Sequence, residues 1–211
     1  MTSTQDITGL VLAGGRGLRM GGADKGLQPF HGVPLALNAL NRLRSGGGIG
    51  PLAINANRHL ADYEALGVPV WPDADSNYAG PLAGFLTGLT HCQTPYLLTV
   101  PCDVPLFPLD LAQRLLTALE TACADLAIAV AAPSDGQGRM PLRSQPVFCL
   151  MRASLLPSLR PFIQSGKFKV QDWCDLHTTA LASFDRPTDH PQAFSNANTL
   201  SELRHLESQT P

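Results

Sequence analysis

The stretch Ile7-Thr-Gly-Leu-Val-Leu-Ala13, followed at once by the glycine-rich segment Gly14–Gly26, predicts both the fold and the site. The first stretch is short and mostly apolar and is closed by glycines, which is typical of a strand buried on both faces. Six of the thirteen residues from Gly14 to Gly26 are glycine. Glycine lets backbone N–H groups approach a ligand closely, and Arg16, Arg19 and Lys25 add positive charge. The segment after the strand is therefore predicted to bind phosphate.

The rest of the chain alternates short apolar runs with segments of helical spacing. Further strands are expected at Leu52 to Asn55, Val68 to Trp71, Tyr96 to Val100, Leu126 to Ala132, Val147 to Met151 and Thr178 to Ala182. Helices are expected at Pro34 to Arg44, His59 to Leu66, Pro81 to His91, Leu109 to Cys123, Ala153 to Gln164 and Thr199 to Leu206. The polar segment Ser134 to Pro146 is expected to be a loop. This alternation predicts one Rossmann-like α/β domain of three layers, with a mostly parallel sheet covered on both faces.

Two common phosphate-binding motifs do not fit the glycine-rich segment. The P-loop pattern requires Ser or Thr after its lysine, but Lys25 is preceded by Asp24 and followed by Gly26. The dinucleotide-binding pattern begins well at Gly15 but has Met20 where its third glycine belongs. A flexible surface loop is the alternative interpretation. Because the segment follows a buried strand, and ligands bind to such sheets at the carboxyl ends of strands, phosphate binding is favoured.

Composition excludes several classes of function. Of the 211 residues, 44% are hydrophobic and 15% charged, with a net charge of −2 and a pI near 6.3. This balance argues against a general nucleic-acid binder or a membrane-surface binder. No apolar stretch approaches the roughly 20 residues that span a bilayer. The polar start of the chain also lacks the pattern of a secretion signal, so the cytoplasm is the expected compartment.

The five cysteines are Cys92, Cys102, Cys123, Cys149 and Cys174. They are widely spaced, odd in number and without a Cys-x-x-Cys pair, so neither a disulfide framework nor a zinc site is favoured. We expect each to be a buried, reduced thiol that packs as a small hydrophobe.

Several short blocks resemble one family of enzymes. They are Leu12-Ala-Gly-Gly15, Arg19-Met-Gly21, Asp24-Lys25, Asn55-Ala-Asn-Arg58-His, Pro72-Asp73, Gly80-Pro-Leu-Ala-Gly84, Pro101-Cys-Asp103-Val-Pro and Asn196-Ala-Asn198. The first three resemble the signature of nucleotidyltransferases, which act on nucleoside triphosphates. The whole set is most similar to the molybdenum cofactor guanylyltransferases. Each block is weak evidence, but together they keep the family's order over nearly the whole chain.

The resemblance implies roles for individual residues. The residues that it implies contact the nucleotide are Leu12, Ala13, Gly14, Gly15, Lys25, Asn55, Asp73 and Asp103. Lys25 and Arg19 would neutralise the charge of the departing pyrophosphate. Asp103, which follows a predicted strand, would act in catalysis by holding Mg²⁺, because this ion prefers hard oxygen ligands. Asn196 and Asn198 would contact the acceptor, although a turn before the last predicted helix explains them equally well.

Structural interpretations remain open for some of these residues. Asp103 could cap the helix that starts near Pro108, and Asn55 and Asp73 could be turn residues. The glycines of Gly80–Gly84 fit either an anion site at a helix start or close packing of that helix against the sheet. Neither interpretation of the glycines is favoured by the sequence.

The resemblance implies a nucleotide-diphospho-sugar transferase-like fold over residues 1–211. Residues 6–105 would bind the nucleotide and residues 106–211 the acceptor. The expected reaction joins GMP from GTP to molybdenum-bearing molybdopterin and releases pyrophosphate. Proteins that deliver the cofactor or mature molybdoenzymes are possible partners, and nucleic acid and membranes are not expected. The alternatives are a cytidylyl- or other nucleotidyltransferase of the same fold with a different acceptor, and a non-catalytic nucleotide sensor.

Overall fold

The computed structural model describes residues 2–14, 24–74, 80–132 and 141–209. Its strands are β1 (Ile7–Leu12), β2 (Pro29–Phe30), β3 (Val33–Pro34), β4 (Leu52–Asn55), β5 (Val70–Trp71), β6 (Tyr96–Pro101), β7 (Leu126–Ala131), β8 (Arg143–Arg152) and β9 (Thr179–Phe184). Its α-helices are α1 (Leu35–Ser45), α2 (Leu60–Glu64), α3 (Pro81–His91), α4 (Leu111–Thr121), α5 (Leu156–Gln164), α6 (Val170–Cys174) and α7 (Leu200–Gln209). Short 3₁₀ turns are η1 (Thr4–Asp6), η3 (Lys25–Leu27) and η4 (Ala153–Leu155).

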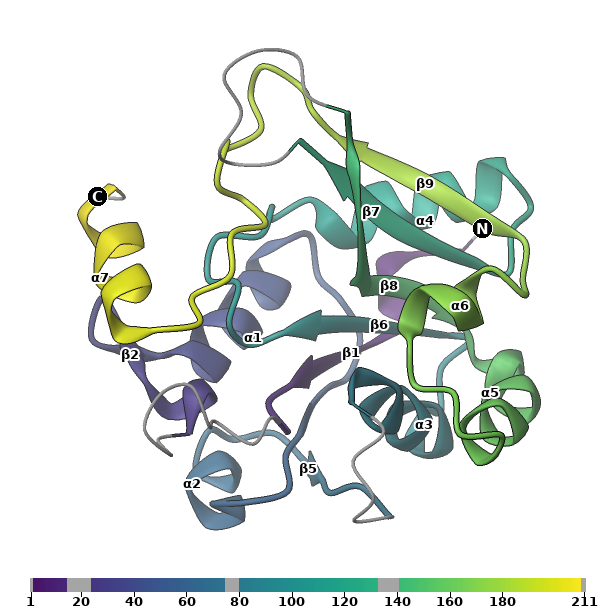
Figure 1. The fold of residues 1–211 in the computed structure, drawn as a ribbon, viewed down its shortest axis with the longest axis horizontal. Helices are drawn as coiled ribbons and strands as arrows, with labels where there is room; N and C mark the ends of the chain where they lie inside the picture. The colour runs from purple at the N-terminus through teal and green to yellow at the C-terminus, as the bar shows by residue number, and fades with distance from the viewer. Residues whose placement is uncertain (1, 15–23, 75–79, 133–140, 210–211) are drawn as a thin grey trace.

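One sheet of seven strands, in the order β5-β4-β1-β6-β8-β7-β9, runs through the described chain (Figure 1). β1 pairs in parallel with β4 and β6, β4 with β5, and β7 with β9. Only β8 within this sheet is antiparallel to its neighbours, β6 and β7. The prediction of a single α/β domain with a mostly parallel sheet is confirmed.

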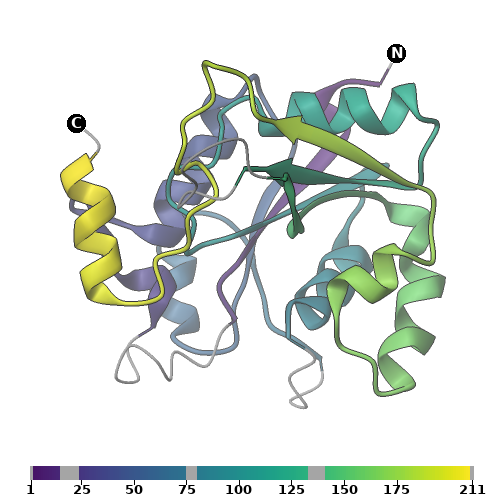
Figure 2. The same cartoon turned by 45° about the horizontal axis from the view of Figure 1, so that its top comes forward.

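Helices cover both faces of the sheet and form two apolar layers. α4 and the α5–α6 pair lie on opposite sides of the strands (Figure 2). The alternate side chains of β1 divide between these layers, with Val11 in the layer that contains α1 and α4 and Leu10 in the layer that contains α3, α5 and α6. Both side chains are 0% exposed, which explains why β1 carries apolar residues on both of its faces. No described helix has the length and apolar character needed to cross a bilayer.

The described structure corrects several sequence predictions. The predicted loop Ser134 to Pro146 is wrong in its last part, because β8 starts at Arg143 and the polar residues there pair with β7. Residues 133–140 lie outside the described chain. The short α6 and the β2–β3 hairpin were not predicted, because five-residue and two-residue elements carry no resolvable periodicity. The prediction that every cysteine is buried is wrong for Cys123, which is exposed, and for Cys92, which is partly buried, because both lie where the chain leaves a helix, α4 and α3 respectively.

The glycine-rich run 46–50, between α1 and β4, has a structural explanation. Gly47 and Gly48 adopt positive φ angles of 98° and 77°, and their carbonyls accept hydrogen bonds from the Thr4 hydroxyl. A Cβ at Gly50 would clash with the backbone oxygen of Gln5. The run therefore lets the connection pass close to η1.

Candidate functional site

Three side chains from distant parts of the chain meet at the carboxyl ends of β1 and β6. The Lys25 ammonium donates to Asp103 Oδ2 at 3.0 Å and to Asn198 Oδ1 at 2.9 Å. The side chains of Lys25 and Asp103 are 21% and 17% exposed, so the pair is partly shielded but reachable from solvent. We call Lys25, Asp103 and Asn198 the phosphate-side cluster. It brings a cation and a carboxylate to the edge where ligands bind to such sheets.

The backbone fixes Asp103 from two sides. β6 ends at Pro101 in register with Leu12 of β1, and the Cys102 N–H donates to the Leu12 carbonyl at 3.1 Å. The Ala197 N–H donates to the Asp103 carbonyl at 2.8 Å, which places Asn198 beside Lys25. The helix-cap interpretation of Asp103 is wrong, because α4 begins at Leu111 with Asp110 as its N-cap residue.

A second group of polar residues lies at the ends of β4 and β5. The Asp73 carboxylate accepts hydrogen bonds from Asn55 Nδ2 at 2.8 Å, Asn57 Nδ2 at 2.7 Å and Thr87 Oγ1 at 2.9 Å. The Asp73 N–H donates to Asn57 Oδ1 at 2.8 Å, which fixes the orientation of that amide. We call Asn55, Asn57, Asp73 and Thr87 the nucleoside-side cluster. Asn55 is the last residue of β4, so the interpretation of it as a turn residue is wrong, whereas Asp73 lies just after β5, where a structural role in the connection stays open.

The end of β1 and the residues after it run directly against this cluster. The Ala13 N–H donates to the Asn55 carbonyl at 2.8 Å. A Cβ added to Gly14 would lie 3.1 Å from Asn57 Nδ2 and 3.3 Å from Asn55 Oδ1. Gly14 therefore keeps space beside the asparagines, as expected where backbone must approach a ligand. Leu12, Ala13 and Gly14 lie where the sequence predicts; Gly15 and Arg19 lie outside the described residues.

The glycines of α3 are explained by close packing. A Cβ at Gly84 would lie 2.6 Å from Leu12 Cδ2 and 2.7 Å from Asn55 Oδ1. Gly80 precedes the helix with a φ of 60°. Close packing of α3 against β1 and β4 therefore accounts for Gly84, while Gly80 supplies a backbone conformation that other residues rarely adopt.

The remaining predicted residues differ in position. Asn196 is exposed, whereas Asn198 joins Lys25 rather than a separate acceptor surface. Cys102 is buried, and burial followed by the nearby Asp103 and Asp24 charges raises the pKa of its thiol well above the ordinary range. A protonated, buried thiol is not a nucleophile, in agreement with its predicted packing role.

The phosphate-side cluster fits magnesium that arrives with a triphosphate. Asp103 offers one carboxylate, of which Oδ2 accepts from Lys25. Across residues 2–14, 24–74, 80–132 and 141–209, no three His, Cys, Asp or Glu side chains gather to form a metal cage. Mg²⁺ in nucleotide sites commonly uses one or two carboxylates, with phosphates and water as the other ligands. A single partly exposed aspartate is sufficient for that arrangement.

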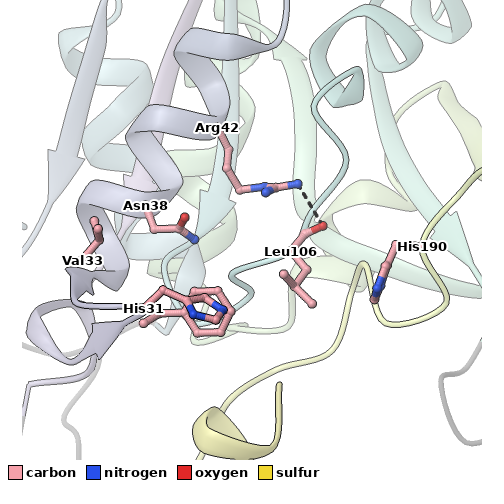
Figure 3. Close-up of a pocket in the computed structure, with 7 residues that line it drawn as sticks. His31, Val33, Asn38, Arg42, Leu106 and His190 are labelled. Atoms are coloured by element: carbon pink, nitrogen blue, oxygen red, sulfur yellow. Dashed lines mark hydrogen bonds between the residues drawn. The ribbon is translucent and has the colours of Figure 1, made fainter. Parts of the chain in front are cut away.

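A pocket of about 390 Å³ lies between α1, the segment after β6 that carries Leu106, and the segment that carries His190 (Figure 3). Its lining residues are Phe30, His31, Val33, Asn38, Arg42, Leu106 and His190. Arg42 donates to the carbonyls of Leu106 and Phe107, so its guanidinium braces the loop after Asp103. Phe30 and Leu106 pack with Ala197 in a small apolar cluster. No residue of the phosphate-side cluster lines this pocket, so the two are separate features.

Sequence reasoning missed four residues that hold these clusters together. Asn57 and Thr87 fix Asp73, and a buried hydrogen bond joins Tyr63 to Asp24. The Asn-x-Asn spacing could have indicated Asn57, because alternate residues after a strand point the same way. Nothing in the sequence indicates that Tyr63 or Thr87 reaches a polar partner far along the chain.

The fold and its two clusters define a class of protein. A glycine-rich connection follows β1, a carboxylate follows β6, and amide and carboxylate groups follow β4 and β5 along one edge of the sheet. This is the arrangement expected of a nucleotidyltransferase, whose ligands would lie at the carboxyl ends of the parallel strands.

Comparison with known proteins identifies the family. The family model described as the MobA-like NTP transferase domain matches residues 9–209. A molybdenum cofactor guanylyltransferase from Albidiferax ferrireducens is 62% identical over 98% of both chains, and one from Bordetella pertussis is 54% identical over 99% of this chain and 100% of its own. The chain belongs to the family of molybdenum cofactor guanylyltransferases.

Solved structures agree on the fold. Molybdopterin-guanine dinucleotide biosynthesis protein A from Archaeoglobus fulgidus aligns with a TM-score of 0.72 over 96% of this chain and 97% of its own, at 18% identity. A CMP:2-keto-3-deoxy-manno-octonic acid synthetase aligns equally well, with a TM-score of 0.72 over 96% of both chains at 9% identity. At such identities the alignments establish the shared fold alone.

Proposed function

We propose that the protein transfers GMP from GTP to molybdenum-bearing molybdopterin, forming molybdopterin guanine dinucleotide and pyrophosphate. The observation that carries the proposal is the Lys25–Asp103–Asn198 cluster at the ends of β1 and β6. It occurs in a chain that is 62% identical to a protein named molybdenum cofactor guanylyltransferase. The residues fit nucleotidyl transfer, and the names of the relatives support guanine and the molybdenum cofactor as the substrates.

In the proposed reaction, the terminal phosphate of the acceptor attacks the α-phosphorus of GTP in line. A phosphate oxygen is already ionised near neutral pH, so no strong general base is needed. The chain's task is to align the two phosphates and to stabilise the charge that moves onto pyrophosphate. Lys25 would contact that charge directly, and Arg19 would add to it from the glycine-rich segment.

Asp103 would hold Mg²⁺, which supplies positive charge to the phosphate oxygens when bound. In the structure Asp103 pairs with Lys25 at 3.0 Å. When the nucleotide binds, Mg²⁺ would take the place of Lys25 beside Asp103, and phosphate would take the place of Asp103 beside Lys25. Both side chains would therefore keep a partner of opposite charge. The partial exposure of both side chains makes such an exchange feasible.

The nucleoside would lie against Asn55, Asp73 and the backbone of Leu12–Gly14. Among the described residues, Asp73 Oδ2 accepts one hydrogen bond, from Asn57, while Oδ1 accepts two. A carboxylate oxygen can accept about two hydrogen bonds, so Oδ2 has room for a donor from the ligand. Such a donor could come from guanine or from the ribose.

Two further elements of the proposal concern the acceptor and the cellular setting. Residues 106–211 would carry the acceptor, with Asn196 exposed beside Asn198. The five cysteines are all free thiols, which supports the cytoplasm as the compartment because disulfides are rare there. Proteins that deliver the cofactor or mature molybdoenzymes are the proposed partners.

The test is pyrophosphate release by purified protein with Mg²⁺, molybdopterin, and GTP, CTP, UTP or ATP in turn. The proposal predicts release with GTP alone, lost in Asp103→Asn and retained in the control Asp110→Asn, which changes an exposed aspartate. Turnover with CTP but not with GTP would show that the protein transfers CMP rather than GMP. Tight GTP binding without turnover would indicate a sensor.

A further inference from the structure

Tyr63 and Asp24 form a buried hydrogen bond directly behind Lys25. Tyr63 is 0% exposed and Asp24 is 7% exposed. The Tyr63 hydroxyl donates to Asp24 Oδ1, although 39 residues separate them in the chain. Burial, then the neighbouring Cys102 and the Asp24 hydrogen bond, raise the pKa of Tyr63, so its hydroxyl stays protonated and donates.

The residue after Lys25 is held by the same pair. The Gly26 N–H donates to Asp24 Oδ1 at 3.2 Å, and a Cβ at Gly26 would clash with the Tyr63 ring and hydroxyl. Asp24 is also the N-cap residue of η3, which begins at Lys25. Both chain neighbours of Lys25 are therefore fixed by contacts with Tyr63.

Tyr63 reaches this position from the nucleoside-side segment. The chain leaves β4 at Asn55, passes Asn57 and turns into α2 at His59, whose φ is 51°. α2 then places Tyr63 in the apolar layer below the phosphate-side cluster. One short segment thus supplies side chains both to the nucleoside-side cluster and to the support of Lys25.

We propose that Tyr63, acting through Asp24, is a positioning residue that holds Lys25 against the phosphates of the nucleotide. This inference rests on the proposed role of Lys25 in nucleotidyl transfer. A buried carboxylate is costly unless its hydrogen bonds are satisfied, so loss of the Tyr63 hydroxyl leaves Asp24 underbonded and free to shift. Lys25 follows Asp24 directly, and its ammonium would shift with it.

The test is a double-mutant cycle in turnover. Tyr63→Phe removes only the hydroxyl, and we expect kcat to fall about 10-fold with a smaller change in KM for GTP, as for a hydrogen bond to a charged group. In the Lys25→Ala background the same change should alter turnover less than about twofold, because the group being positioned is gone. A merely structural Tyr63 would lower turnover by the same factor in both backgrounds, and that result would overturn the inference.

Tyr96→Phe is the matched control. Tyr96 is also buried, and its hydroxyl bonds to Arg152 at the opposite end of β6 from Asp103. Its turnover should stay within about twofold of the parent. Thermal unfolding of all variants identifies any loss through misfolding.

The cycle has a second readout that separates the two proposals. Absence of turnover in the parent protein would contradict the proposed reaction but not the positioning role. The same four proteins are then compared in the Kd for Mg²⁺·GTP and for guanosine. If the effects of Tyr63→Phe and Lys25→Ala on the Kd for Mg²⁺·GTP are not additive, while those on the Kd for guanosine are, the inference is supported. Additive effects on the Kd for Mg²⁺·GTP overturn it.

Discussion

Replacing Asn57 with aspartate tests the geometry of the nucleoside-side cluster. Asn57 Nδ2 donates to Asp73 Oδ2 at 2.7 Å, so Asn57→Asp places two carboxylate oxygens at that separation. At this distance two unit charges repel by about 6 kcal/mol if the effective dielectric constant is about 20. The repulsion disappears if one of the two carboxyls stays protonated. Keeping an ordinary aspartate, of pKa about 3.9, protonated at pH 7 costs about 4 kcal/mol, so the free energy of unfolding should fall by no more than this amount.

The loss of stability should depend on pH in a defined direction. Folding brings the two carboxyls together and so raises the affinity of the pair for a proton. The penalty is therefore absent below about pH 4 and grows as the pH rises towards 7. At pH 5 the proton costs about 1.5 kcal/mol, so the loss should shrink by about 2.5 kcal/mol between pH 7 and pH 5.

Urea unfolding at the two pH values measures this difference. Asn41→Asp is the control, because Asn41 is exposed on α1 and accepts from Arg44 at 3.3 Å, where a new negative charge is tolerated. A loss in Asn57→Asp that is equal at pH 5 and pH 7, or no larger than in the control, would show that the two side chains do not lie in contact.

Three further changes have defined outcomes. Lys25→Met should lower pyrophosphate release about 100- to 1000-fold by removing the charge beside the phosphates, and unchanged release would contradict this. Gly84→Ala should lower the free energy of unfolding, measured by thermal unfolding, by about 1–3 kcal/mol, because its Cβ would lie 2.6 Å from a Leu12 methyl group. An unchanged stability would show that α3 shifts to relieve this contact. Burial opposes ionisation of Asp189, but the hydrogen bonds from Arg114 and Arg186 outweigh it and lower its pKa. Asp189→Asn should therefore lose about 1–3 kcal/mol in urea unfolding at pH 7, a deficit that disappears as the pH falls through that lowered pKa; a deficit independent of pH would argue against the ion pair.

The parallel core of the fold follows from local sequence. Ile7–Leu12 is mostly apolar over one strand length, and Leu52–Asn55 and Pro81–His91 each begin at or just after a Gly-Pro pair, so their predicted bounds agree closely with the structure. The first residues of β8 escaped prediction because Arg143 is exposed and polar, and only its pairing with Ala131 makes it part of a strand. Pairing of this kind is a tertiary property.

The site is predictable only where its residues lie next to strands. Asp103 and Asp73 follow β6 and β5, and the ligand-binding edge of the sheet indicates their position. Asn198 is different, because 173 residues separate it from Lys25 and no spacing rule connects them. The resemblance indicates Asn198 as a site residue, but the sequence does not show that its amide oxygen accepts from Lys25.

Transfer of label from GTP is the most direct test of the central claim. Purified protein is incubated with Mg²⁺, molybdenum-bearing molybdopterin, and GTP labelled at either the α- or the γ-phosphorus. The account predicts that α-label enters the pterin product while γ-label appears only in pyrophosphate, and that Asp103→Asn abolishes both. Entry of γ-label into the pterin, or α-label transfer from CTP but not from GTP, would contradict it.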